Sequence, residues 1–202
     1  SEALRMVETC TQEHFRAMSL IHALGWRTTY QDAVPADYMA REITDERWVP
    51  FFRQDYEEGI NHGLLLYRGE KAVSCCTYGP ARVGPSPRQS SLVSFDARGY
   101  EGWGELISFY THPEEKGKGY GSRLMEEALN RLKAAGFPAV LVMVLRENEG
   151  ARRFYARHGF AWDGTHVDVP FPPDSVCVDL RYTRQLLTKA PATAYVDSAE
   201  RL

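Results

Sequence analysis

The residues best suited to chemistry lie in a glycine-rich segment, HPEEKGKGYGSRLMEEAL, which spans residues 112–129. Gly117, Gly119 and Gly121 come directly before an apolar repeat that is typical of a helix. Glycine lets the backbone curl around an anion, and a helix start presents unpaired N–H groups and a positive dipole end. Lys116 and Lys118 add positive charge. The segment therefore predicts a binding site for a phosphate or pyrophosphate group.

Two common phosphate-binding motifs do not match this loop. A Walker A loop reads GxxxxGK[ST], and the glycine spacing here differs from it. The dinucleotide fingerprint GxGxxG, started at Gly117, requires a glycine where this chain has Ser122. From the loop alone, a flexible turn before a surface helix stays open as the alternative. Three more features favour a site: Glu105 in an apolar strand segment, Asn148 at the start of a later helix, and the FYARHGF pattern (154–160), which ends that helix with an aromatic pair and then a turn.

Strands and helices in the second half of the chain must position these residues. A strand over 104–112 precedes the glycine loop, and an amphipathic helix over 120–135 follows it, ended by Gly136. The near-continuous apolar run 139–145 is typical of a central strand covered on both faces. Asn148 can cap a helix that stops at Gly159, and two final strands are expected, in FAWDGT (160–165) and over 176–186.

The first half supplies a short strand over 4–10 and a helix that begins at Thr11 and ends at Gly25. Helical pieces are expected around 36–42 and 45–58, the second interrupted or restarted at Pro50. A hairpin follows over 62–79, and a long loop over 80–102 contains an irregular strand at SLVSF. This order predicts a mixed α/β sheet in one domain over 1–187, with parallel pairing at the strand–helix–strand crossover. The tail 188–202 is expected to be frayed or to contact a neighbouring subunit.

Composition excludes several classes of function. A net charge of −3 provides no overall basic field for nucleic acid. No apolar run approaches the roughly 18 residues that a membrane span needs, and the N-terminal segment lacks the layout of a signal peptide. Four cysteines without metal-ligand spacing predict free thiols in a reducing cytoplasm and no metal site.

Two segments resemble the motifs of one enzyme family. ELISFYTHPEEKGKGYGSRLMEEAL (105–129) resembles motif A of the GNAT superfamily of N-acetyltransferases, whose loop reads Q/R-x-x-G-x-G/A. NEGARRFYARHGF (148–160) is similar to motif B. One departure is Lys116, which stands where the motif has Gln or Arg and lacks the guanidinium fork. The resemblance covers residues 4–186 and is to a single-domain member of bacterial type.

This resemblance implies a fold and a reaction. The fold is the GNAT fold, an α/β arrangement with a mixed, mostly antiparallel central sheet and a splayed parallel strand pair, flanked by helices. The splayed pair corresponds to residues 104–111 and 139–145. The reaction is direct transfer of an acetyl group from acetyl-CoA, as co-substrate, to a primary amine of a small molecule, peptide or protein, in a ternary complex. A non-catalytic acyl-CoA-binding sensor and a transferase that uses another acyl-CoA are the alternatives. Many members dimerise through final strands or tails, so a homodimer is also implied.

The resemblance further implies roles for individual residues. Tyr155 matches the tyrosine that acts as general acid toward the CoA sulfur, and Glu105 lies where some members carry the general base, with a buried core tyrosine and an exposed edge glutamate as the alternatives. Trp26, Tyr30 and Tyr78 are expected to line the acceptor pocket, although aromatic residues in helices also belong to cores. Cofactor contacts are implied for three groups: strand residues Phe109, Tyr110 and Thr111; loop residues Lys116, Gly117, Lys118, Gly119, Tyr120, Gly121 and Ser122; and Asn148.

Overall fold

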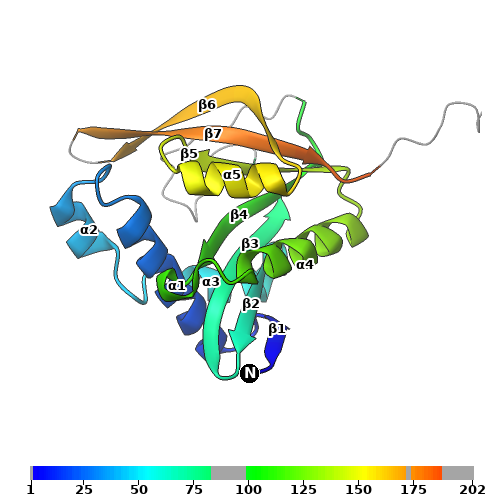
Figure 1. Cartoon of the computed structure of the whole chain (residues 1–202), viewed down its shortest axis with the longest axis horizontal. Helices are drawn as coiled ribbons and strands as arrows, with labels where there is room; N and C mark the ends of the chain where they lie inside the picture. The colour runs from blue at the N-terminus through cyan, green and yellow to red at the C-terminus, as the bar shows by residue number, and fades with distance from the viewer. Residues whose placement is uncertain (1, 83–98, 172–173, 188–202) are drawn as a thin grey trace, which may run out of the picture.

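The computed structural model describes residues 2–82, 99–171 and 174–187, which form a single seven-stranded sheet with helices on both faces (Figure 1). The strand order is β1-β2-β3-β4-β5-β7-β6. In chain order the elements are β1 (Leu4–Glu8), α1 (Gln12–Thr29), α2 (Ala36–Glu42), α3 (Val49–Glu58), β2 (His62–Arg68), β3 (Lys71–Pro80), β4 (Gly104–Thr111), a 3-10 turn η1 (Pro113–Glu115), α4 (Tyr120–Ala134), β5 (Ala139–Leu145), α5 (Glu149–Arg157), β6 (Ala161–Phe171) and β7 (Ser175–Gln185).

The sheet is mixed, as the order of elements predicts. Strands β4 and β5 pair in parallel, and every other neighbouring pair among the described strands is antiparallel. The helix α4 provides the crossover between β4 and β5. The expected α/β sheet with one parallel pair is therefore confirmed.

Two hydrophobic cores lie on opposite faces of the sheet, because neighbouring strand residues point in opposite directions. On one face, Leu64 of β2 packs with α4 and α5, where Leu124 and Leu132 are fully buried. On the other face, Leu65 of β2 packs with α1 and α3, and Met18 is fully buried there. The alternation along β2 thus assigns each helix layer to its own side of the sheet.

Helix α1 differs from the sequence expectation, because it continues through Gly25 to Thr29. Gly25 is needed for packing, since a Cβ atom at this position would lie 2.3 Å from Cδ1 of Tyr110. The ring of Tyr110 therefore contacts the helix backbone directly. The expectation that Gly25 ends the helix was wrong. Glycine is present here because it allows another element to pack closely against the helix, and it does not act as a helix stop.

Other differences concern element bounds. The helix expected over 45–58 begins at Val49, next to Pro50, as one of the two alternatives had it, and is not interrupted there; the missing N–H of Pro50 in this first turn removes no helical hydrogen bond. Strand β6 extends to Phe171, well beyond the expected FAWDGT strand. The predicted strand at SLVSF and the predicted tail 188–202 fall outside the described residues, so the tail and the homodimer stay predictions.

Candidate functional site

A cleft opens where the two parallel strands separate. Strands β4 and β5 pair only from Gly104 to Leu106, although both strands continue beyond that point. A register shift between β3 and β4 follows immediately, at Thr77 and Tyr78. Such a bulge bends a strand and increases its twist, which accounts for the divergence of β4 from β5. The expected splayed pair is therefore present.

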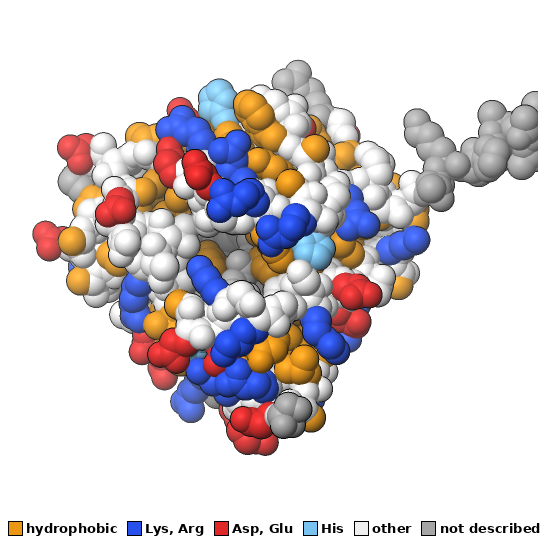
Figure 2. Space-filling view, in the orientation of Figure 1, with side chains coloured by type: hydrophobic (Ala, Val, Ile, Leu, Met, Phe, Trp, Pro, Cys, Tyr) orange, Lys and Arg blue, Asp and Glu red, His pale blue; other side chains and the backbone are white. Residues whose placement is uncertain are grey.

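The separated strands border a cavity of about 790 Å³. Its walls come from β4, β5, α1, α2, α3, α5, the glycine loop, the end of β6 and the middle of β7. Figure 2 shows a hollow at the centre of this face, with Lys and Arg side chains on both sides of its opening. Basic residues thus gather at the opening of a chain whose net charge is −3.

The glycine loop forms one part of the cavity wall. Gly117 and Gly119 have positive φ angles of 79° and 82°, and Gly119 is the N-cap of α4. A Cβ atom at either glycine would find no other atom within 4 Å, so open space lies beside both. The first N–H groups of a helix have no intrahelical partner, and those of α4 start at this wall. This geometry suits an anion, as the sequence predicts.

Most of the loop residues expected to bind cofactor line this cavity: Lys116, Gly117, Gly119, Tyr120, Gly121 and Ser122. Lys118 instead forms an ion pair with Glu115, with Nζ 2.8 Å from Oε2. Glu115 is almost fully buried and also accepts two hydrogen bonds from Arg68 and an ion pair from Lys71. These cations hold the pKa of the Glu115 carboxyl well below its usual range. Lys118 therefore contributes to an anchor that ties the loop to the β2–β3 hairpin.

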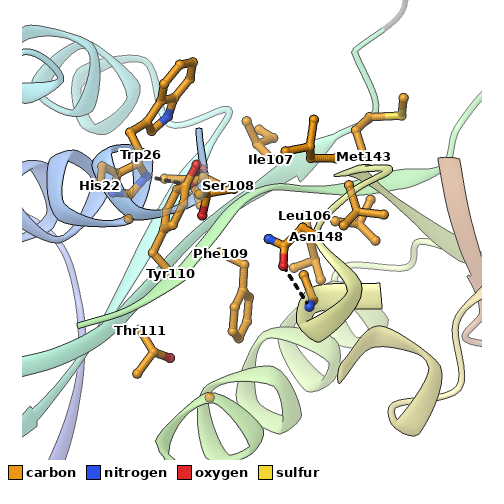
Figure 3. Close-up of a pocket in the computed structure, with 18 of the residues that line it drawn as sticks. His22, Trp26, Leu106, Ile107, Ser108, Phe109, Tyr110, Thr111, Met143 and Asn148 are labelled. Carbon is orange, nitrogen blue, oxygen red and sulfur yellow. Dashed lines mark hydrogen bonds between the residues drawn. The ribbon is translucent and has the colours of Figure 1, made fainter. Parts of the chain in front are cut away.

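The strand residues Phe109, Tyr110 and Thr111 line the cavity from β4. Their backbone pairs with β3 on one side, and on the other side β5 has already diverged. Figure 3 shows Tyr110 and Ser108 on the side of α1, with Phe109 pointing the opposite way. The backbone edge of β4 beyond Leu106 is thus directed at the cavity, where an extended ligand could pair with it.

Asn148 and Tyr155 come from the start and the middle of α5. The Asn148 side chain caps the helix by accepting a hydrogen bond from the Ala151 N–H at 3.1 Å, and it also lines the cavity (Figure 3). Tyr155 is buried among Phe109, Phe154 and Phe160 and reaches the same cavity. Burial raises the pKa of the Tyr155 phenol above its ordinary value of 10. The phenol therefore keeps its proton at neutral pH and can act as a donor.

Glu105 is placed differently from the expectation of a glutamate that faces an open cleft. It is fully buried at the start of β4, where Arg82 donates to it from Nη2 at 2.6 Å and from Nε at 3.1 Å. Arg82, and not Glu105, is among the residues that line the cavity. Its carboxylate oxygens are already occupied by the Arg82 guanidinium and do not face the cavity, so the geometry gives no support to the base role.

The acceptor residues expected from the sequence divide into two groups. Trp26 and Tyr30 of α1 line the cavity, and their rings lie 4.3 Å apart. Tyr78 does not face it, because this residue is buried in the core beneath α4 and stacks against His62. Tyr78 shares its sheet face with Cys76, two residues earlier in β3, and Cys76 belongs to the same core, so strand alternation directs Tyr78 away from the cavity.

Two residues that line the cavity, Asp179 and His22, were not predicted from the sequence as site residues. Asp179 of β7 lines the cavity, and the signal for it was an acid inside an apolar strand, VCVDL, the same signal that drew attention to Glu105. His22 of α1 also lines the cavity, and burial lowers its pKa to about 4. The His22 Nδ1–H donates to the Met18 carbonyl at 2.8 Å, so Nε2 accepts from the Ser108 hydroxyl at 2.8 Å. No sequence pattern distinguished His22 from the other histidines.

The described residues also bear on metals and membranes. They contain no group of three or more His, Cys, Asp or Glu side chains that could hold a metal ion. None of the described helices is both long enough and apolar enough to cross a membrane.

Comparison with known proteins assigns the chain to one protein family. Residues 21–160 match the model of the Acetyltransferase (GNAT) family. An uncharacterized N-acetyltransferase of Bacillus subtilis (strain 168), YuaI, is 26% identical over 136 residues, which cover 67% of this chain and 69% of that protein.

Solved structures share the fold. The PaiA N-acetyltransferase of Thermoplasma acidophilum, in complex with coenzyme A, superposes with a TM-score of 0.65 at 14% identity, over 91% of this chain and 99% of that chain. A putative acetyltransferase of Salmonella typhimurium, YncA, with its cofactor acetyl-CoA, has a TM-score of 0.63 at 16% identity, over 92% of this chain and 96% of that chain. The GNAT fold expected from the sequence is thereby confirmed.

Proposed function

Because this chain belongs to the acetyltransferase (GNAT) family, we propose that it moves an acetyl group from acetyl-CoA to a primary amine by direct transfer in a ternary complex. One observation carries the proposal: a single cavity is lined both by Gly119 of the anion-binding loop and by Trp26 of the aromatic wall. A phosphate-bearing donor and an amine acceptor can therefore meet within one enclosure.

The residues present fit acetyl-CoA. The pyrophosphate would lie against the helix start at residues 117–122, where the positive φ of Gly117 and Gly119 leaves open space. The pantetheine arm would follow the backbone edge of β4 beyond Leu106, and Asn148 lies on the facing side. When bound, acetyl-CoA supplies the thioester from which the acetyl group is taken. Two solved relatives with the same fold carry coenzyme A or acetyl-CoA.

The chain supplies a proton donor for the leaving sulfur. Tyr155 lines the cavity beside Phe109, whose strand carries the proposed pantetheine contacts. Burial raises the pKa of this phenol, so it stays protonated at neutral pH and holds a proton for the thiolate that forms as the C–S bond breaks.

The experiment separates a transferase from a sensor. Calorimetry measures binding of acetyl-CoA, and mass spectrometry then follows acetylation across a panel of primary amines. Mass spectrometry is preferable to a thiol reagent because Cys10 is an exposed free cysteine and would react. Binding together with an acetylated amine supports the proposal. Tight binding with no acetylated product from any amine would favour the sensor, and transfer only from a longer acyl-CoA would identify a different donor.

A further inference from the structure

Asp179 is placed at the aromatic wall of the cavity by the register of β7. It pairs with Leu145 of β5 and Val167 of β6. Alternation along β7 puts it on the same sheet face as Cys177, which packs in a cluster with Phe171, Trp26 and Tyr30. The opposite face of β7 carries Leu180, which belongs to the core beneath α4 and α5. The Asp179 carboxylate is therefore directed at the cavity wall built from α1 and β6.

The Asp179 carboxylate is available to a ligand, because no neighbouring charged group among the described residues is bonded to it. No hydrogen bond or ion pair joins its carboxylate to another residue in the described part of the chain. Arg82 exerts an attractive field on Asp179, but its guanidinium donates to Glu105. The other titratable groups that interact with Asp179 are Tyr30 of α1, Tyr110 of β4, Cys177 of β7 and Glu147 after β5.

Burial and nearby charges also change the pKa of the Asp179 carboxyl. Burial, as the main cause, raises its pKa from 3.8 to about 6; Glu147 raises it further and Arg82 lowers it. At neutral pH the group is mostly ionised, yet it is much more basic than an ordinary aspartate. A cationic group that binds beside it would restore the electrostatic partner that the fold does not provide.

Aromatic rings enclose the space beside this carboxylate. Trp26 and Tyr30 lie with ring centroids 4.3 Å apart, and the Phe171 ring lies 5.9 Å from Trp26. Tyr38 of α2 closes the same cluster, 5.7 Å from Phe171. Such rings favour an apolar or aromatic body and also attract an ammonium group through their faces.

We propose that Asp179 binds the ammonium group of the acceptor amine and accepts its proton. This inference rests on the acetyltransferase function proposed above. We propose further that the acceptor is a monocationic primary amine on an aromatic or bulky apolar body. A second positive charge on the acceptor would be disfavoured, because the basic side chains that line the cavity (Arg47, Arg82, Lys116 and Arg157) outnumber the acidic ones (Asp55 and Asp179). Arg47 lies over the ring of Trp48, which borders Trp26, and is therefore close to the aromatic rings.

With Asp179 and Tyr155 as the proton carriers, the atoms and charges of the proposed acetyl transfer balance. The ammonium gives its first proton to the Asp179 carboxylate, which releases it to solvent, and the neutral nitrogen forms the new N–C bond. As the C–S bond breaks, the sulfur takes the proton of the Tyr155 phenol. The nitrogen gives up its second proton, which restores the phenol. The sum is one ammonium and one thioester converted to one amide, one thiol and one released proton.

The test compares Asp179→Asn with the wild-type protein in two independent measurements. Calorimetry with 2-phenylethylamine, on protein saturated with CoA, should give at least tenfold weaker amine binding for the variant. The acidic limb of kcat/KM, with an apparent pKa of about 6 in the wild type, should disappear. Affinity for acetyl-CoA should not change. Asp168→Asn is the matched control, since Asp168 is exposed on neighbouring β6, and it should behave as the wild type.

Each alternative outcome has a definite meaning. Unchanged amine binding and an unchanged acidic limb in Asp179→Asn would overturn the role of Asp179. Higher kcat/KM with 1,4-diaminobutane than with 2-phenylethylamine would overturn the acceptor class. Folding is not expected to suffer, because the substitution removes a half-buried carboxylate that has no hydrogen-bond partner among the described residues. If it does suffer, Asp179→Glu, which keeps the charge, must restore amine binding or the proposal fails. Amine binding that depends on Asp179 without any transfer would refute the proposed function alone.

Discussion

Arg82 and Glu105 form an ion pair that takes the most obvious strand glutamate out of the cleft. The Arg82 side chain donates to both carboxylate oxygens, from Nη2 at 2.6 Å to one and from Nε at 3.1 Å to each. Its backbone N–H also donates to Oε1 at 3.0 Å. Glu105 thus fastens the chain that follows β3 to the start of β4, just before the two parallel strands separate.

Glu105→Gln should therefore lower stability and leave the pH dependence of the reaction unchanged. Loss of the charged acceptor weakens several hydrogen bonds, and we expect the free energy of unfolding to fall by about 1–3 kcal/mol. Urea denaturation measures this fall, and the pH profile of kcat/KM should keep its acidic limb. Glu101→Gln, at an exposed position, is the control. A missing acidic limb in Glu105→Gln would restore Glu105 as the base.

Tyr155→Phe should reduce turnover while cofactor binding persists. The phenol is buried beside Phe109 and Phe160, and phenylalanine fills the same space, so packing is retained. Loss of a general acid typically lowers kcat by roughly 100- to 10,000-fold. Steady-state kinetics together with calorimetric titration of acetyl-CoA test this. A variant with wild-type kcat would show that another group protonates the sulfur.

Gly119→Ala should weaken acetyl-CoA binding, and Gly136→Ala provides a closely matched control. Both glycines have positive φ, 82° and 93°, and both have open space where a Cβ would lie. Each substitution should cost about 1–2 kcal/mol of stability from backbone strain. Only Gly119 is at the cavity, at the start of α4, whereas Gly136 follows its end. We expect the Kd for acetyl-CoA to rise at least tenfold in Gly119→Ala alone. Equal Kd values for the two variants would argue against a phosphate at the helix start.

His22 should make the fold sensitive to mild acid. Its pKa is lowered from 6.5 to about 4 by burial, so between these values the unfolded chain binds a proton that the folded chain refuses. Stability from this group is complete above pH 6.5 and falls by about 3 kcal/mol as the pH drops to 4. Denaturant unfolding of wild type and His22→Gln at both pH values measures the effect. The stability difference between them should shrink on acidification, and a constant difference would contradict the lowered pKa.

The pattern of neighbouring residues in the sequence was enough to predict the loop, helices and strand that position the site. The glycine loop, the amphipathic helix after it and the capping Asn148 are encoded by neighbouring residues, and each lies where the sequence placed it. Periodicity also identified β5 as a central strand, because residues covered on both faces leave a continuous apolar run. With the resemblance of residues 105–129 and 148–160 to the GNAT motifs, the sequence by itself determined the family and the splayed strand pair.

Only the tertiary structure decided which charged groups are available to a ligand. Glu105 and Asp179 are alike in sequence, each an acid in an apolar strand, but Arg82 pairs with Glu105 and leaves Asp179 directed at the cavity. Likewise Lys118 pairs with Glu115, while its near neighbour Lys116 lines the cavity. Whether a charge is satisfied depends on partners that strand register and helix packing bring near. Spacing along the chain carries no record of those contacts.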